Sequence, residues 1–93
     1  MRAGTTSTGF EYEFDETRLD DMRFVDILAV VTDQDAPKFE RVSGVSKLIN
    51  MLLGEKQKAA LYEHIGKDHE GRVPREELEK ALGEIMTSSE LKN

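Results

Sequence analysis

Aromatic and acidic residues alternate near the N-terminus, in the run Phe10-Glu11-Tyr12-Glu13-Phe14. A period of two predicts a short β-strand with one buried face. A single strand is not stable in water, so we expect this segment to pair with another segment, another copy of the chain or a partner. The alternative is an extended arm that lays its three aromatic rings on a helical core.

Beyond residue 20 the apolar positions recur at spacings of three and four, which is typical of helices with one buried face. The carboxylate of Asp20 or Asp21 can accept hydrogen bonds from the free N–H groups of a first turn, so a helix is expected to begin there. We expect it to be a buried helix that runs to about Thr32. Its apolar stripe comprises Met22, Val25, Leu28 and Ala29, with Phe24, Ile27 and Val31 beside it.

The pattern continues in three further predicted helices. Asp35 is expected to cap the second helix, which has Pro37 in its first turn and ends at Gly54, because glycine tolerates the left-handed conformation found at helix ends. Its middle is weakened at residues 43–44, Ser-Gly, where we expect either a kink or a split into two. A short third helix runs from about residue 55 to residue 65.

Pro74 opens the fourth predicted helix, whose apolar stripe comprises Leu78, Ala81, Leu82, Ile85 and Met86. The sequence therefore predicts a mainly α fold, a small four-helix domain with a short N-terminal β-strand or extended arm. We expect residues 1–9 to be a disordered tail, residues 10–87 to form a single helical domain and residues 88–93 to fray.

Composition limits the possible partners. A chain of 93 residues with 38% hydrophobic and 34% charged residues has a thin core, which a partner or self-association often completes. The net charge of −6 disfavours nucleic acid, and the absence of a dense basic cluster disfavours an anionic membrane surface. No apolar run approaches the roughly 20 residues of a membrane span. The chain has no cysteine, which suits the cytoplasm and excludes a thiolate zinc site.

Motifs for catalysis are absent from the sequence. It contains no Ser/His/Asp arrangement, no Gly-x-Ser-x-Gly and no glycine-rich phosphate loop. His64 and His69 are five residues apart with Gly66 between them, whereas two metal ligands on one helix face lie three or four apart. We therefore predict a protein that is not an enzyme and carries no cofactor.

The loop before the fourth helix suggests a calcium site as an alternative. Gly71, followed six residues later by Glu77, matches the second half of an EF-hand loop, and Asp68 and Glu70 also fall at ligand positions. However, Gly66 stands where that loop needs an oxygen ligand, and no second loop is visible. A degenerate EF-hand-like module with Asp68, Glu70 and Glu77 as ligands is thus an alternative function. The simpler interpretation is a loop that turns the chain.

An interaction surface remains as the main functional prediction. The strand that carries Tyr12 and Phe14 could offer an edge for β-pairing. The segments around Leu53 and Met86 contain more apolar residues than one helix stripe needs. We therefore choose Tyr12, Phe14, Leu53 and Met86 as candidate partner-binding residues. Ordinary core positions are the alternative for each of them.

Several features, taken in order, resemble one known family. An acidic aromatic strand is followed by Asp-Asp-Met at 20–22, Leu-Leu-Gly-Glu-Lys-Gln at 52–57, His-Ile at 64–65 and Asp-His-Glu-Gly-Arg-Val-Pro at 68–74. Over residues 10–93 the chain resembles the tail assembly chaperones of long-tailed bacteriophages and their prophage relatives, especially those of Gram-positive hosts. In addition, Leu91-Lys92-Asn93 can be encoded by a string that contains A-AAA-AAC, a slippery heptamer for −1 frameshifting, which this family commonly uses.

The resemblance implies a mostly helical protein without enzymatic activity. Such a chaperone coats the aggregation-prone tape measure protein in the host cytoplasm before the tail tube polymerises, and it is not part of the mature virion. The implied partners are the tape measure protein, further copies of the chain itself and, as an additional candidate, the tail tube protein. A small helical adaptor of unrelated origin is a further alternative.

Overall fold

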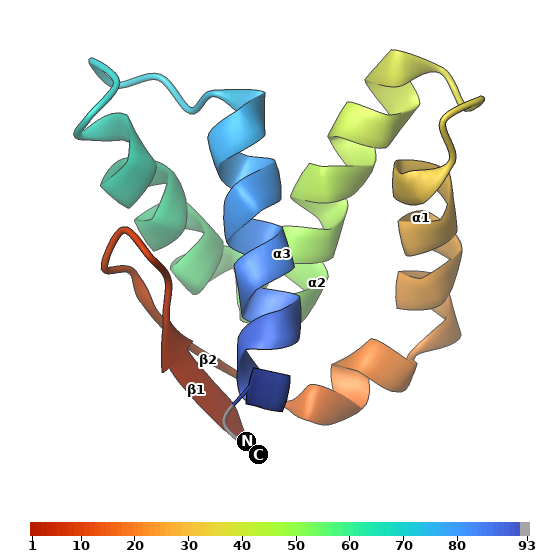
Figure 1. The fold of residues 1–93 in the computed structure, drawn as a ribbon, viewed down its shortest axis with the longest axis horizontal. Coiled ribbons are helices and arrows are strands. Elements are labelled where there is room, and N and C mark those ends of the chain that lie inside the picture. The colour runs from red at the N-terminus through yellow and green to blue at the C-terminus, as the bar shows by residue number, and fades with distance from the viewer. Residues whose placement is uncertain (92–93) are drawn as a thin grey trace.

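The structure, a computed structural model, describes the backbone of residues 1–91 and the side chains of residues 1–87. It is mainly helical, at 67%. The element order is β1 (Arg2–Thr5), β2 (Glu11–Phe14), a short 3-10 helix η1 (Glu16–Asp20), α1 (Met22–Thr32), α2 (Lys38–Gly66) and α3 (Arg75–Leu91) (Figure 1). No helix of the described residues is long and apolar enough to cross a membrane.

The N-terminus forms a β-hairpin, which corrects the expected disordered tail over residues 1–9. β1 pairs with β2 in an antiparallel register that sets Arg2 opposite Phe14 and Thr5 opposite Glu11. The expected strand with alternating burial is confirmed, because Phe10, Tyr12 and Phe14 are buried and the acidic residues between them are exposed. The sequence of β1, Arg-Ala-Gly-Thr, has no alternation of large apolar and polar residues, so its strand conformation depends on pairing with β2.

β2 pairs with β1 and also lays its aromatic rings on the helices. The two alternatives for this segment, a paired strand and an arm packed on a helical core, are therefore both present in one arrangement. The side-chain amide of Gln57 in α2 binds the backbone of Glu13, accepting from its N–H at 2.9 Å and donating to its carbonyl at 2.7 Å. A helix side chain thus takes the place of a neighbouring strand at this residue. At Glu13, therefore, this edge of β2 is not open to a partner strand.

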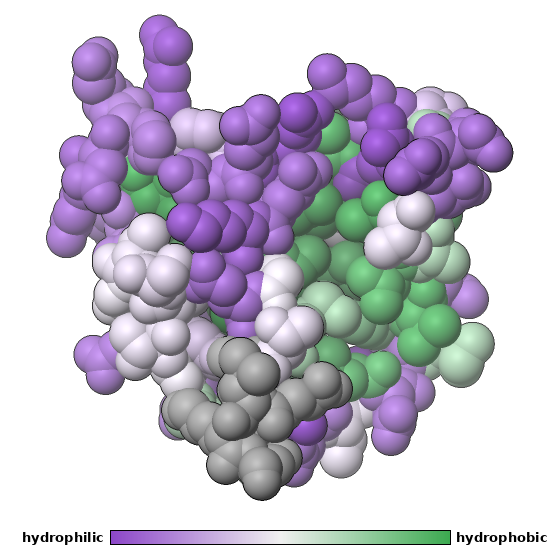
Figure 2. Space-filling view, viewed as in Figure 1, coloured by the Kyte–Doolittle hydropathy of each residue, from purple (hydrophilic) through white to green (hydrophobic). Residues whose placement is uncertain are grey.

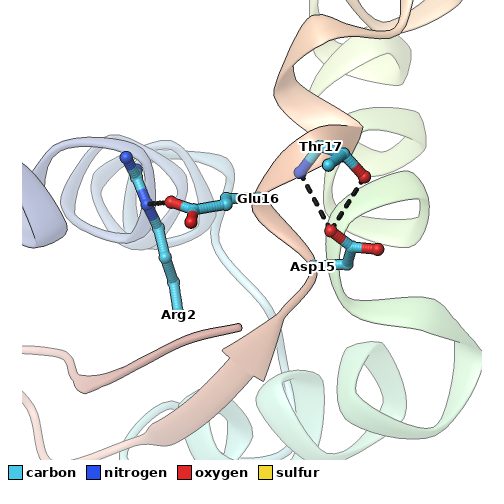
Figure 3. Close-up of polar contacts among 4 residues, drawn as sticks. All are labelled: Arg2, Asp15, Glu16 and Thr17. Carbon is cyan, nitrogen blue, oxygen red and sulfur yellow. Dashed lines mark hydrogen bonds and ion pairs between the residues drawn. The ribbon is translucent and has the colours of Figure 1, made fainter.

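Local capping connects the hairpin to the helices (Figure 3). Asp15 accepts hydrogen bonds from the Thr17 N–H at 3.0 Å and from the Thr17 hydroxyl at 2.8 Å, and these bonds hold the pKa of the Asp15 carboxyl below its usual value. Arg2 of β1 forms an ion pair with Glu16 of η1. Asp21, one of the two residues predicted as the cap, then caps α1 by accepting from the Arg23 N–H at 2.9 Å.

α2 corrects the four-helix prediction, because the described residues contain three α-helices. The second and third predicted helices join into one element of 29 residues, which bends at Gly54 (φ 81°, ψ 167°). The break lies at the predicted glycine, but the helix resumes without a loop. Its two halves diverge from this point, and α3 lies across the opening between them (Figure 1). The helix is preceded by Pro37 as N-cap instead of Asp35.

The weak point expected at Ser43 and Gly44 is not a break. Gly44 stays helical and brings α2 close to α1, because a Cβ built at Gly44 would lie 2.6 Å from Cγ2 of Val31. α3 begins directly after Pro74, close to the predicted start, and its backbone is helical to Leu91. The predicted frayed segment therefore overlaps a helix over residues 88–91, while residues 92–93 lie outside the described part.

The core lies where the hairpin, α1, both halves of α2 and α3 meet. Its fully buried side chains come from all three helices and comprise Phe24, Val45, Leu48, Ile49, Leu52, Leu61 and Ile85. The three aromatic residues from the hairpin segment close one side of this cluster.

Candidate interaction surface

The four residues chosen from sequence as partner-binding candidates do not form an exposed surface. Tyr12, Phe14 and Leu53 are buried, and Met86 is half-buried against the same cluster. The Tyr12 and Phe14 rings stack with their centroids 6.2 Å apart. These residues belong to the core because the hairpin folds back onto the helices and α2 bends at Gly54. The alternative of ordinary core positions fits these four residues.

Exposed apolar side chains gather instead on α1. Eight of the 11 residues of this helix are apolar, and they form two stripes on different sides. The stripe of Phe24, Ile27, Leu28 and Val31 packs against the core. The other stripe points outward, so the expectation of a wholly buried helix is wrong for it. Met22, Val25, Ala29 and Val30 are exposed, and we call these four residues the outer α1 face.

The side chains of this face are unusually exposed for apolar residues. Met22 is 63% exposed, and Val25 and Val30 are each 37% exposed. Burial of exposed apolar side chains is favourable, and a group of them on one side of a helix commonly marks an interaction site. Figure 2 shows apolar side chains gathered over α1 and the first half of α2, with hydrophilic residues along the upper rim.

Acidic residues precede, interrupt and follow the outer α1 face along the chain. Between residues 20 and 33 the chain carries four acidic residues, Asp20, Asp21, Asp26 and Asp33, and a single basic residue, Arg23. All five are exposed. Because complementary charge at the rim of an interface favours association, this face suits a partner whose apolar stripe is flanked by lysine or arginine. The same charges oppose the approach of another acidic surface.

Hydrogen bonds of hydroxyl side chains with a glutamate and a histidine hold the turn of the hairpin in place. Glu84 of α3 accepts from the N–H of Ser7 at 2.7 Å and from its hydroxyl at 2.8 Å, and these two bonds lower the pKa of the Glu84 carboxyl. Thr8 Oγ1 lies 3.1 Å from Nε2 of His64. The cluster therefore fastens the hairpin to α2 and α3.

The structure does not bring the candidate metal ligands together. Nε2 of His69 lies 3.7 Å from the Glu77 carboxylate, while His64 contacts the hairpin instead. Within the described part of the chain, no group of three or more His, Cys, Asp or Glu residues could hold a metal ion, so Asp68, Glu70 and Glu77 form no such set. Glu70 and Gly71 both have positive φ angles and turn the chain between α2 and α3.

One signal in the sequence could have revealed the outer α1 face. A helix of three turns with two apolar stripes can bury only one of them against a single neighbouring helix.

Comparison of the chain with protein-family models, with curated proteins and with solved structures found no significant match.

Proposed function

We propose that this chain is a non-enzymatic binding protein, a tail assembly chaperone that holds the tape measure protein of a long-tailed phage or prophage in the host cytoplasm before the tail tube assembles. The observation that carries the proposal is the exposed apolar outer α1 face within an acidic rim. The order of motifs along residues 10–93, which resembles that family, supports the choice of partner.

In this proposal the outer α1 face covers an apolar stripe on a helix of the tape measure protein. Two helices packed along such stripes exclude water from both, and the acidic rim then meets basic residues beside the partner's stripe. Full burial of a methionine or valine side chain is favourable by about 1.5–3 kcal/mol, so the exposed parts of Met22, Val25 and Val30 contribute roughly 3 kcal/mol together.

That energy is small beside the entropy lost on association, so one copy alone binds weakly. A long partner with many apolar stripes can hold many copies at once, and contacts between linked binding sites then raise the total affinity. A net charge of −6 on each copy opposes aggregation of the coated partner.

The direct test is binding to a fragment of the tape measure protein encoded in the same genome. We expect the double variant M22S/V25S to raise the dissociation constant roughly tenfold or more, because it replaces two of the largest apolar contacts. The double variant A59S/A60S is the matched control, since Ala59 and Ala60 are also exposed apolar residues but lie in the second half of α2, outside this face. Equal binding by both variants and the natural chain would contradict the assigned surface.

The gene itself separates a tail chaperone from an unrelated helical adaptor. We expect the codons of residues 91–93 to contain A-AAA-AAC, followed by an open −1 frame and then by a long reading frame with helical periodicity. The absence of a long helical frame near this gene would count against the tape measure protein as the partner.

A further inference from the structure

Phe39 is a further apolar side chain that the fold leaves largely exposed. It lies in the first turn of α2 and is 82% exposed. Phenylalanine is one of the residue types most often buried, and a full aromatic ring in water is a common anchor at protein interfaces. Val45 and Leu48, farther along the same helix, are buried, whereas Phe39 is not.

An open apolar hollow lies directly beside Phe39. Its volume is about 240 Å³, and it lies between the first turns of α2, the second half of α2 and the start of α3. The Tyr62 hydroxyl bonds the Ser46 hydroxyl at 3.2 Å, which satisfies these two polar groups at the wall. The apolar and aromatic side chains around the hollow are Phe39, Val42, Val45, Tyr62, Val73 and Leu78.

The charges around Phe39 differ from those around the outer α1 face. Lys38 and Glu40, the two neighbours of Phe39, are exposed and carry opposite charges. Arg75 at the edge of the hollow lies 3.9 Å from both Glu76 and Glu79, so its positive charge offsets one of these two negative charges. Another acidic copy of the chain would therefore be repelled less strongly here than at the outer α1 face.

We propose that Phe39 mediates a two-fold dimer of this chain, with the Phe39 ring of each copy in the hollow of the other. A two-fold interface uses the same patch on both copies, so a projecting side chain beside a hollow is complementary to itself. In the arrangement that we propose, the two α2 helices run antiparallel and cross at Phe39, so that Lys38 of one copy lies opposite Glu40 of the other, twice. A second copy thus satisfies the shape and the charge of this patch together. The dimer does not rest on the proposed chaperone function.

The test is sedimentation velocity of the full chain over a range of concentrations, with interference optics because the chain has no tryptophan. We expect a monomer–dimer equilibrium whose dissociation constant rises roughly tenfold or more in Phe39→Ser. Since Phe39 is mostly exposed, the variant should fold, which its far-UV circular dichroism would show. The matched control M22S, on the outer α1 face, should dimerise like the natural chain.

Charge reversal tests the two-fold geometry itself. Lys38→Glu and Glu40→Lys should each weaken the dimer, because like charges then face each other, and the double reversal should restore it. A chain that is monomeric at every concentration, a dimer unaffected by F39S, or a double reversal as weak as the single ones would overturn the proposal. These measurements need only the chain itself, so their failure is separate from a failure to bind a tape measure protein.

Discussion

Gly54 offers the sharpest test of how this fold is built. Its φ of 81° and ψ of 167° lie in a region that residues with a Cβ occupy only at a cost of about 1–3 kcal/mol. Apart from its chain neighbours and the nearby backbone of its own helix, a Cβ built at Gly54 would meet no described atom within 4 Å, so the substitution Gly54→Ala tests backbone strain without a clash against another element. Alanine also favours a straight helix, which would separate the two halves of α2 from the hairpin and α3.

The expected effect is large for a domain of this size. A loss of 1–3 kcal/mol removes a substantial share of a typical unfolding free energy of about 5–15 kcal/mol. Because each kcal/mol shifts the midpoint by about 4–8 °C in domains of up to about 100 residues, Gly54→Ala should lower Tm by roughly 5–20 °C. Thermal and urea denaturation followed by circular dichroism would measure it.

The chain contains a matched control for this prediction. Gly83 lies within α3, is exposed and likewise has open space where a Cβ would stand. Gly83→Ala should therefore stabilise the protein by about 0.4–1 kcal/mol, because alanine loses less conformational freedom in a helix. Opposite signs for the two substitutions are the result we expect. If Gly54→Ala were as stable as the natural chain, the bend would not depend on glycine and our account of α2 would be wrong.

Three further predictions follow from the packing, the pKa shift and the loop. Gly44→Ala should destabilise the protein by about 1–3 kcal/mol in urea denaturation, because its Cβ would lie 2.6 Å from Cγ2 of Val31. In a double-mutant cycle, Val31→Ala should offset part of that loss, and additive losses would contradict this contact. The two hydrogen bonds from Ser7 lower the pKa of Glu84 in the folded state. These bonds therefore stabilise the fold at pH values above the unfolded-state pKa, and their contribution is lost as pH falls through the folded-state pKa. The stability of Glu84→Gln should therefore vary less over this acidic range, and an unchanged pH profile would refute the bond's role. Millimolar calcium should leave Tm unchanged because the described residues form no metal-binding group, whereas a rise would favour the EF-hand-like alternative.

Local signals predicted much of the backbone correctly. The cap at Asp21 depends on a carboxylate close to the free N–H groups of the first turn, and the end of α1 at Thr32 depends on the residues that follow it. In both cases the residues that interact are close together in the sequence. The alternation in the segment that contains Tyr12 predicted both the strand and its buried face. Gly54 marked the break in α2 because its conformational freedom is a property of the residue itself.

Other features depended on which segments meet in space. β1 has no periodic pattern, so its strand conformation follows from pairing with β2, which a local reading cannot foresee. Gln57 has the same polar character as many exposed helix residues, and only the packed hairpin makes it a partner of Glu13. The burial of Leu53 and Met86 likewise follows from the angle at which the two halves of α2 diverge.

The outer α1 face shows most clearly what the sequence determines and what the tertiary structure determines. Composition and spacing alone determined that α1 is a helix with two apolar stripes, because periodicity is written along the chain. Only the tertiary structure decided which stripe is buried, since Gly44 lets the side of α1 that carries Ile27 and Val31 approach α2 closely. The side that carries Met22 and Val25 then faces solvent, because a helix packed against one neighbour can bury only one of its sides.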